Sequence, residues 1–192
     1  MSSRQEAYMH RKSPLVPALA LVASLALTGC ITARGPGGAP PPVPQIDRTR
    51  LYTGDWHEIA YRPTWLTRGC VAGITRYGAW TGPNTVEVRD SCRIDTVDGR
   101  EKAVEGEGRI LDPGRDARIR VTYLPFVSRE TWVAAVAPDY SWFISVTPDF
   151  GELNIFTRDP QISDALRREL TARAEALGYD TSKLYFPPQP ER

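Results

Sequence analysis

The sequence has few of the residues on which metal sites, nucleic-acid contacts and phosphate-binding loops depend. It contains 2 His in 192 residues, and His10 lies in a segment that we expect to be removed, so a His-based metal site is excluded. The net charge is +1, which leaves no basic excess for binding a phosphate backbone. No Gly-x-Ser-x-Gly motif and no phosphate-binding loop occurs in the sequence. We therefore expect no metal, no cofactor and no nucleic-acid partner.

The longest apolar run is too short to cross a membrane. Leu15–Leu27 covers 13 residues, whereas a transmembrane helix needs about 20. A run of this length after a basic start is typical of a secretory signal peptide. It ends in Leu27-Thr28-Gly29-Cys30, which resembles the lipobox of bacterial lipoproteins. The alternative is an ordinary signal peptide followed by a chance cysteine.

The resemblance to the lipobox implies a lipid anchor. In bacterial lipoproteins the thiol at the position of Cys30 is lipidated, and cleavage makes this residue the new N-terminus. Several acyl chains on one residue attach a protein almost permanently, whereas a single chain binds only marginally. The next residue is Ile31 and not Asp, which by the family's sorting rule indicates the outer membrane. We expect residues 1–29 to be a signal peptide and the mature protein to be anchored there, facing the periplasm.

The segment that follows is predicted to be a tether. Residues 30–47 hold the lipidated Cys30 and a stretch rich in Pro, Gly and Ala, a composition that builds no core and forms a semi-stiff spacer. Residues 48–192 have the length of one domain. Loss of residues 1–29 removes three basic residues and one acidic residue, which changes the net charge to −1.

The domain is dominated by alternation of apolar and polar residues with a period of two. Turn signals such as Asp98-Gly99 and Asp112-Pro113-Gly114 interrupt the alternation every 8–14 residues. Strands joined by such hairpin turns can close into an eight-stranded antiparallel up-and-down β-barrel, whose lumen accepts one small ligand. We predict this all-β fold, with strands near 54–62, 70–80, 85–94, 102–111, 117–124, 130–137, 141–146 and 152–158.

One convincing α-helix follows the strands, near the C-terminus. Ser163 is a suitable N-cap, and Gly178 is a suitable end. We expect this helix to pack on the outside of the sheet. The apolar residues at helical spacing between these ends are Leu166, Leu170, Ala174 and Leu177.

Two cysteines remain in the mature chain, and we expect them to form a disulfide bond. The compartment is oxidising, where a pair of cysteines is expected to bridge. The midpoint between Cys70 and Cys92 falls in the Thr81–Asn84 turn, so two strands that fold back there bring the cysteines together. A catalytic cysteine is disfavoured, because His57 is the one His left as a partner.

Three separate motifs resemble those of the lipocalin family. They are Gly54-x-Trp56 near the start, Asp139-Tyr140 after the sixth strand, and Arg158 at the end of the last strand. The intervening sequence is similar to the bacterial outer-membrane lipoprotein branch. The resemblance implies that Arg158 lies across the Trp56 ring and closes one end of the barrel, a cation–π contact worth ~1–2 kcal/mol. These residues then support the fold and bind no ligand.

The resemblance also implies which residues reach the ligand. Several strand residues match positions that line the pocket in relatives, and two loop residues match the loop that guards the open mouth. Each of them is also compatible with ordinary core packing. The strand residues are Tyr77, Val88, Asp90, Val121, Tyr123, Trp132 and Ala134, and the loop residues are Trp65 and Leu66.

A pair of glutamates on one predicted strand offers a catalytic alternative. Glu105 and Glu107 share one strand face and could form an acid–base pair. Gly106 and Gly108 between and beside them suit a lumen that needs room, which places the glutamates in water. We therefore favour a binding role and expect no enzymatic activity.

The sequence thus predicts a lipid-binding outer-membrane lipoprotein. The ligand is expected to be a long-chain fatty acid such as palmitate, or a lysophospholipid, carried or stored for membrane biogenesis or repair. Burying about ten methylene groups gains ~8 kcal/mol before ordering costs. The alternatives are an enzyme that transforms a bound lipid, with Glu58 or Asp90 as the acting residue, and a structural envelope protein with a filled barrel. We expect a monomer or a homodimer.

Overall fold

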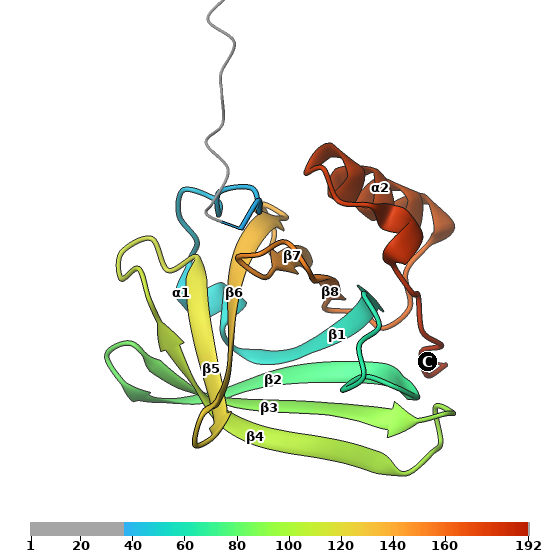
Figure 1. Cartoon of the computed structure of the whole chain (residues 1–192), viewed down its shortest axis with the longest axis horizontal. Helices are drawn as coiled ribbons and strands as arrows, with labels where there is room; N and C mark the ends of the chain where they lie inside the picture. Colours follow the sequence, from blue (N-terminus) through green and yellow to red (C-terminus); the bar gives the residue numbers. More distant parts are fainter. Residues whose placement is uncertain (1–36, 192) are drawn as a thin grey trace, which may run out of the picture. The chain divides into compact units, whose positions relative to one another are not determined.

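The structure, a computed structural model, describes residues 37–191. Its eight strands form one closed antiparallel barrel in which each strand pairs with its neighbours in the sequence and β1 pairs with β8 (Figure 1). The predicted up-and-down barrel with a C-terminal helix is confirmed. The elements are α1 (Arg48–Leu51), β1 (Gly54–Tyr61), β2 (Cys70–Gly82), β3 (Thr85–Ile94), β4 (Glu101–Ile110), β5 (Arg118–Leu124), β6 (Val127–Val136), β7 (Trp142–Val146), β8 (Leu153–Thr157), α2 (Asp164–Ala176) and the 3-10 helix η1 (Thr181–Lys183).

Strand β4 shows how the alternating pattern builds the barrel wall. Glu105 and Glu107 are exposed, whereas Gly106 and Gly108 face inward. A Cβ at Gly108 would lie 2.8 Å from Ile119 Cδ1 and 2.9 Å from Val88 Cγ2. The absence of side chains on this face therefore lets β3 and β5 project their own apolar side chains into the lumen.

The two ends of the barrel differ, and we call them the closed end and the mouth. At the closed end Trp56 is 0% exposed and lies under Arg158, whose guanidinium carbon is 3.6 Å from the Trp56 ring centroid. The indole of Trp56 donates to the carbonyl of Leu51 in α1 at 2.7 Å. The Arg158 guanidinium also donates, at 2.6–2.9 Å, to the carbonyls of Arg50, Thr53 and Asp55.

The turn between β6 and β7 completes the closed end. The Arg50 guanidinium lies 4.4 Å from the centroid of the Tyr140 ring and donates to the carbonyl of Asp139 at 2.8 Å. The Tyr140 hydroxyl accepts from the backbone N–H of Asp47 at 2.6 Å. The three motifs that Gly54, Asp139 and Arg158 represent in the sequence therefore meet at one end of the fold.

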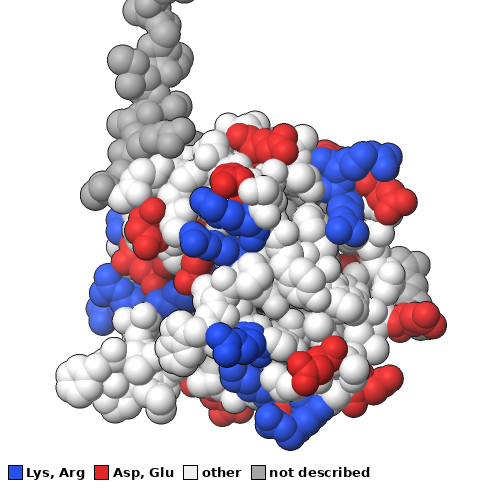
Figure 2. All heavy atoms as spheres, turned by 45° about the vertical axis from the view of Figure 1, so that its right-hand side comes forward, with Lys and Arg blue, Asp and Glu red and all other residues white. Residues whose placement is uncertain are grey.

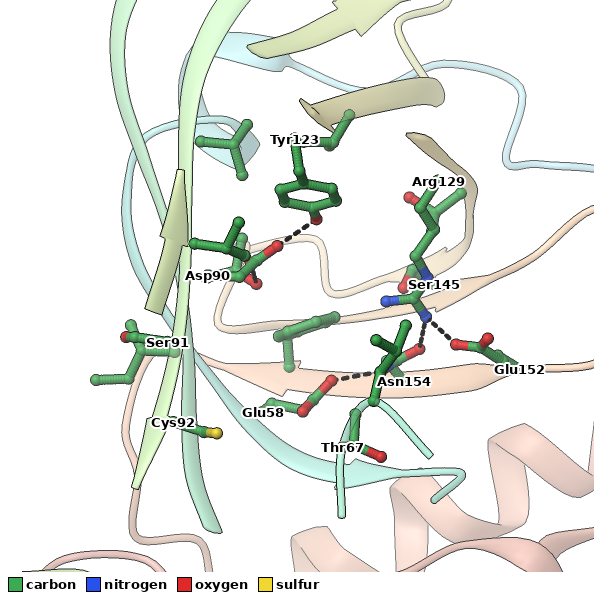
Figure 3. Close-up of a pocket in the computed structure, with 18 of the residues that line it drawn as sticks. Glu58, Thr67, Asp90, Ser91, Cys92, Tyr123, Arg129, Ser145, Glu152 and Asn154 are labelled. Carbon is green, nitrogen blue, oxygen red and sulfur yellow. Dashed lines mark hydrogen bonds and ion pairs between the residues drawn. The ribbon is translucent and has the colours of Figure 1, made fainter. Parts of the chain in front are cut away.

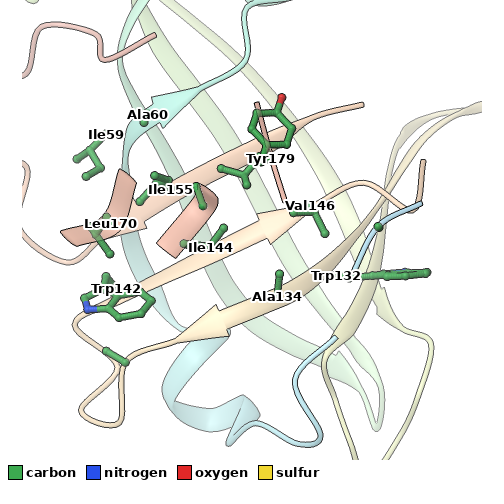
Figure 4. Close-up of a cluster of buried hydrophobic side chains, with 14 residues drawn as sticks. Ile59, Ala60, Trp132, Ala134, Trp142, Ile144, Val146, Ile155, Leu170 and Tyr179 are labelled. Atoms are coloured by element: carbon green, nitrogen blue, oxygen red, sulfur yellow. The ribbon is translucent and has the colours of Figure 1, made fainter. Parts of the chain in front are cut away.

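Helix α2 covers the outer face of the sheet, as the sequence predicts (Figure 4). The Ser163 side chain accepts from the N–H of Leu166 at 3.2 Å, which caps the helix. Leu170 and Ala174 are 0% exposed and belong to one apolar cluster with Ile144 of β7, outside the barrel.

The prediction that Trp132 and Ala134 of β6 face the lumen is wrong. Both belong to the outer apolar cluster, and Trp132 is 7% exposed (Figure 4). The β6 side chains that line the cavity are those of Val127, Arg129, Thr131 and Val133. Apolar character did not distinguish the two faces because the outer face of β6 is covered as well. A register shift between Val133 and Ala135 also interrupts the alternation there.

The segment before α1 is more than a tether. Ala39 is 0% exposed, so the expectation that the Pro-, Gly- and Ala-rich stretch contributes to no core is wrong at this residue, and Ile46, just after that stretch, is 4% exposed. The backbone N–H of Val43 donates to the carbonyl of Val133 at 2.8 Å. This segment is the light blue ribbon that runs along the outside of the sheet in Figure 4. A proline-rich segment can lie along the sheet in this way because its extended conformation needs no internal hydrogen bonds.

The predicted disulfide bond is confirmed. Cys70 at the start of β2 is bonded to Cys92 near the end of β3, with a Cα–Cα distance of 5.4 Å. Both residues lie at the mouth, where β2 begins and β3 ends. Within the described residues, no helix is long and apolar enough to cross a membrane.

Candidate ligand-binding cavity

The barrel encloses a cavity of about 420 Å³ that opens at the mouth. Every strand contributes lining side chains, and their chemistry changes with depth. Apolar side chains form the floor near the closed end, polar side chains form a belt above it, and loop residues form the rim. A volume of this size lies in the range of small-molecule pockets, roughly 300–1,000 Å³.

The floor is built from aromatic and branched side chains of six strands. Tyr77 of β2 pairs with Gly54 at the start of β1, which places it low in the barrel. Phe143 and Phe156 stack with ring centroids 4.7 Å apart, and Phe143 also contacts Trp56. The floor residues that line the cavity are Tyr77, Val88, Ile119, Val121, Val133, Phe143 and Phe156.

The first group of the belt is centred on Asp90 (Figure 3). One carboxylate oxygen of Asp90 accepts from the Tyr123 hydroxyl, and the other accepts from the Thr75 hydroxyl at 2.5 Å. Burial and the Asp90 charge raise the pKa of both Tyr123 and Tyr77, so these phenols keep their protons at neutral pH. The group therefore satisfies its own hydrogen bonds within the wall.

The second group of the belt links three strands, β1, β6 and β8, with Glu152 of the turn before β8. The amide of Asn154 donates to Glu58, and Arg129 Nη2 donates to Asn154 Oδ1 at 2.8 Å (Figure 3). The same nitrogen of Arg129 pairs with Glu152 at 2.6 Å. Burial raises the pKa of Glu58 from 4.5 to about 7, although the Asn154 hydrogen bond and the Arg129 charge act in the opposite direction. Glu58 is therefore the belt carboxyl that changes charge near neutral pH.

The rim is formed by the loop 62–69 on one side and the β5–β6 hairpin on the other. Leu66 of the loop and Val127 of the hairpin both line the cavity entrance. The loop is held across the entrance by the Lys102 ammonium group, which donates to the carbonyl of Leu66 at 2.6 Å. The Arg62 guanidinium donates to the carbonyl of Gly151 at 2.5 Å, which fixes the other end of the loop.

The structure brings six of the nine predicted ligand residues together. Trp132 and Ala134 lie outside the barrel, as described above. Trp65 lies on the rim loop, is 79% exposed, and is not part of the cavity wall. The six in the lining are Leu66, Tyr77, Val88, Asp90, Val121 and Tyr123.

The second belt group is the part of the cavity that sequence reasoning missed. Asn154 is the polar residue in the otherwise apolar run Leu153–Phe156, and Arg129 shares the inward face of β6 with Val127. Polar residues at inward positions were the available signal. Among the described residues no group of His, Cys, Asp and Glu is arranged to hold a metal ion.

The sequence pattern of the lipocalin-like domain family matches residues 46–189. The chain belongs to this family. The resemblance that Gly54-x-Trp56, Asp139-Tyr140 and Arg158 indicated is thereby confirmed, and these motifs lie together at the closed end of this lipocalin.

Two curated relatives extend the comparison. Over 188 residues the chain is 27% identical to the outer membrane lipoprotein Blc of Escherichia coli, a match that covers 94% of this chain and 98% of that protein. Over 148 residues it is 29% identical to temperature-induced lipocalin-1 of Arabidopsis thaliana, which covers 72% of this chain and 77% of the relative.

Solved structures support the fold. Insecticyanin from the tobacco hornworm Manduca sexta superimposes with a TM-score of 0.62 at 21% identity and covers 81% of this chain and 88% of its own. Apocrustacyanin C2 superimposes with a TM-score of 0.56 at 16% identity and covers 80% and 91%. At these identities the likeness supports the barrel architecture alone.

Proposed function

We propose that this lipocalin binds one lipid of the long-chain fatty acid or lysophospholipid class in the barrel cavity. The observation that carries the proposal is an apolar floor below a belt in which Asp90, Glu58 and Asn154 are hydrogen-bonded to neighbouring side chains, with Arg129 Nε as the unpaired buried atom. An acyl tail can pass such a belt without breaking the hydrogen bonds among Asp90, Tyr123, Asn154 and Arg129. About ten buried methylene groups supply ~8 kcal/mol before ordering costs, which is the free energy of micromolar binding.

The polar head of the ligand is proposed to stay at the rim. Arg62 and Lys102 line the entrance and can face an anionic carboxylate or phosphate. Asp90 and Glu58 lie deeper, where a carboxylate head would be repelled by Asp90 and by the charged form of Glu58. This distribution favours a tail-first orientation.

The cellular role that we infer is carriage or storage of lipid at the outer membrane for its biogenesis or repair. Support comes from the lipobox at Leu27–Cys30 and from the similarity to an Escherichia coli protein named as an outer membrane lipoprotein. We propose that residues 1–29 are a signal peptide, that acyl chains on Cys30 anchor the protein, and that residues 48–192 face the periplasm as a monomer or homodimer.

A second candidate function is turnover of the bound lipid. One observation favours it, namely that Glu58 faces the cavity with a pKa of about 7, the value suited to proton transfer at neutral pH. If this candidate holds, the mass of a bound fatty acid or lysophospholipid changes with time in the wild type and not in Glu58→Gln. We favour binding alone, for which an unchanged ligand mass in both proteins is expected.

The binding proposal is tested by titration with palmitate and with lysophosphatidylethanolamine, followed by Trp fluorescence. Val121→Phe fills the floor, whereas Thr122→Phe adds the same ring one position along β5, on the exposed face. Displacing about two methylene groups from the floor corresponds to about tenfold weaker binding. We expect that loss in Val121→Phe and none in Thr122→Phe.

Equal affinities in the two variants would contradict binding in the lumen. A flat titration of the wild type with both lipids would overturn the proposed function itself. Circular dichroism of both variants checks that the barrel has formed.

A further inference from the structure

The exposed apolar side chains of this protein gather at the mouth. Of the seven large hydrophobic side chains that the described residues leave exposed, five lie on the loop 62–69 and the β5–β6 hairpin. Single exposed hydrophobic residues are normal, but a group that rims a cavity marks an interaction surface. We call these five side chains the rim patch: Trp65, Leu66, Leu124, Phe126 and Val127.

The hairpin presents its aromatic ring at a conformational cost. Phe126 has a φ of +68°, in the left-handed region where glycine or asparagine is favoured, and its side chain is 106% exposed. Pro125 precedes it, which fixes the turn. A bulky residue held in this conformation and packed against nothing in the chain points to a contact outside it.

The charges of the rim suit a phospholipid surface. The loop 62–69 carries Arg62 and Arg68 and no carboxylate, and the hairpin residues 124–128 carry no charge, since the next residue, Arg129, lines the cavity and pairs with Glu152. Acidic side chains occupy the other two loops of this end, at 95–100 and 147–152. The face drawn in Figure 2 mixes both signs without a wide area of either. Arg62 and Arg68 beside Trp65, with Phe126 on the opposite hairpin, match the interface of an anionic bilayer.

The start of the described chain lies at this end of the barrel. A Cβ placed on Gly37 would lie 2.3 Å from Asp149 Cα, so Gly37 touches the β7–β8 turn. The same turn accepts, at Gly151, the hydrogen bond from Arg62 that anchors the rim loop. Six residues, 31–36, separate Cys30 from Gly37. At roughly 3.5 Å per residue, even a fully extended chain keeps Cys30 within about 25 Å of Gly37.

We propose that the rim patch docks on the bilayer to which the acyl chains of Cys30 anchor the protein, with the mouth facing the lipid headgroups. The inference rests on the proposed function for the anchor and the ligand. Trp65 and Phe126, from opposite sides of the entrance, insert among the acyl chains, and Arg62 and Arg68 contact phosphates. A lipid then exchanges between leaflet and cavity without crossing water.

The test uses the acylated protein, purified from membranes and reconstituted into phosphatidylethanolamine–phosphatidylglycerol vesicles with brominated acyl chains. Bromine quenches Trp fluorescence on contact. We expect quenching that is lost in Trp65→Phe, which assigns it to Trp65. Phe126→Asp, which changes a residue outside the cavity wall, is expected to reduce quenching to the level of Trp65→Phe.

Thr81→Asp is the matched control, because it adds the same charge at the exposed tip of the β2–β3 hairpin, at the closed end. It is expected to leave the quenching unchanged. Wild-type protein whose Trp65 is not quenched, or equal quenching in Phe126→Asp and wild type, overturns the docking proposal. Palmitate titration of the same proteins in solution separates the two proposals: palmitate binding without Trp65 quenching contradicts docking alone, and quenching without palmitate binding contradicts the proposed function alone.

Discussion

At the closed end of the barrel Trp56 is 0% exposed beneath the Arg158 guanidinium, whereas at the mouth Trp65 is 79% exposed on a loop. The closed end is held by hydrogen bonds from Arg158 to three backbone carbonyls and from the Trp56 indole to Leu51. The mouth is held by a disulfide bond and by two hydrogen bonds of the loop 62–69, one from Lys102 to the carbonyl of Leu66 and one from Arg62 to the carbonyl of Gly151.

The difference between the two ends separates stability from binding. The closed end buries Trp56, Tyr52 and Leu51 almost completely, whereas the cavity opens at the mouth. The mouth leaves apolar side chains exposed, an arrangement that costs free energy in water unless something else covers them. Substitutions at the two ends should therefore affect different measurements.

The largest contrast is expected between the two tryptophans. Trp56→Ala removes a fully buried ring, which costs about 3–5 kcal/mol in the free energy of unfolding. Trp65→Ala changes an exposed side chain, and we expect an effect within about 0.5 kcal/mol. Urea unfolding at neutral pH, followed by circular dichroism, measures both. Similar losses in the two variants would contradict the division between the ends.

Reduction of the disulfide bond is expected to be the next largest effect. The bond closes a loop of sequence separation 22, and by chain entropy a loop of this length contributes about 3 kcal/mol. The comparison is urea unfolding of the wild type with and without dithiothreitol. The double variant Cys70→Ser/Cys92→Ser should unfold as the reduced protein does and show no response to dithiothreitol. A response in that variant would assign the effect to something other than this bond.

A smaller, pH-dependent effect is expected at Glu58. Its pKa is about 7 in the folded protein and 4.5 as an ordinary value, so the folded state holds the proton more tightly. The stability from this group is fully present below pH 4.5 and is lost as the pH rises through 7, by at most about 3 kcal/mol and less where the lumen solvates the carboxyl. Glu58→Gln keeps an oxygen that can accept from Asn154 but does not titrate.

The measurement is the free energy of unfolding of wild type and Glu58→Gln at pH 4.5, 6 and 8. The variant is expected to gain stability relative to the wild type as the pH rises. A difference that does not vary with pH would show that Glu58 is solvated like a surface carboxyl.

The barrel could be predicted from the sequence because most strands have one apolar face and one polar face. On β3, Val86 and Val88 alternate with the exposed Glu87, and turn residues mark both ends of the strand. The helix was predicted for the same reason, since Ser163 and Gly178 bound a clear apolar spacing. The short helix α1 was not predicted, because four residues carry no periodicity.

The inward face of β6 and the second belt group could not be predicted in the same way. Trp132 and Ala134 are apolar although they face outward, because Ala39 and helix α2 belong to the cluster that buries this part of the outer face. The contacts among Glu58, Asn154 and Arg129 join residues up to 96 positions apart. Such contacts form when the barrel closes, so the local sequence pattern around each residue does not predict them.

The most direct test of lipid binding in the lumen is lipid mass spectrometry of protein isolated gently from membranes. We predict one single-chain lipid, a fatty acid or a lysophospholipid, in the wild type and in Thr122→Phe, and its loss from Val121→Phe. Equal lipid content in all three proteins, or none in the wild type, would contradict the account.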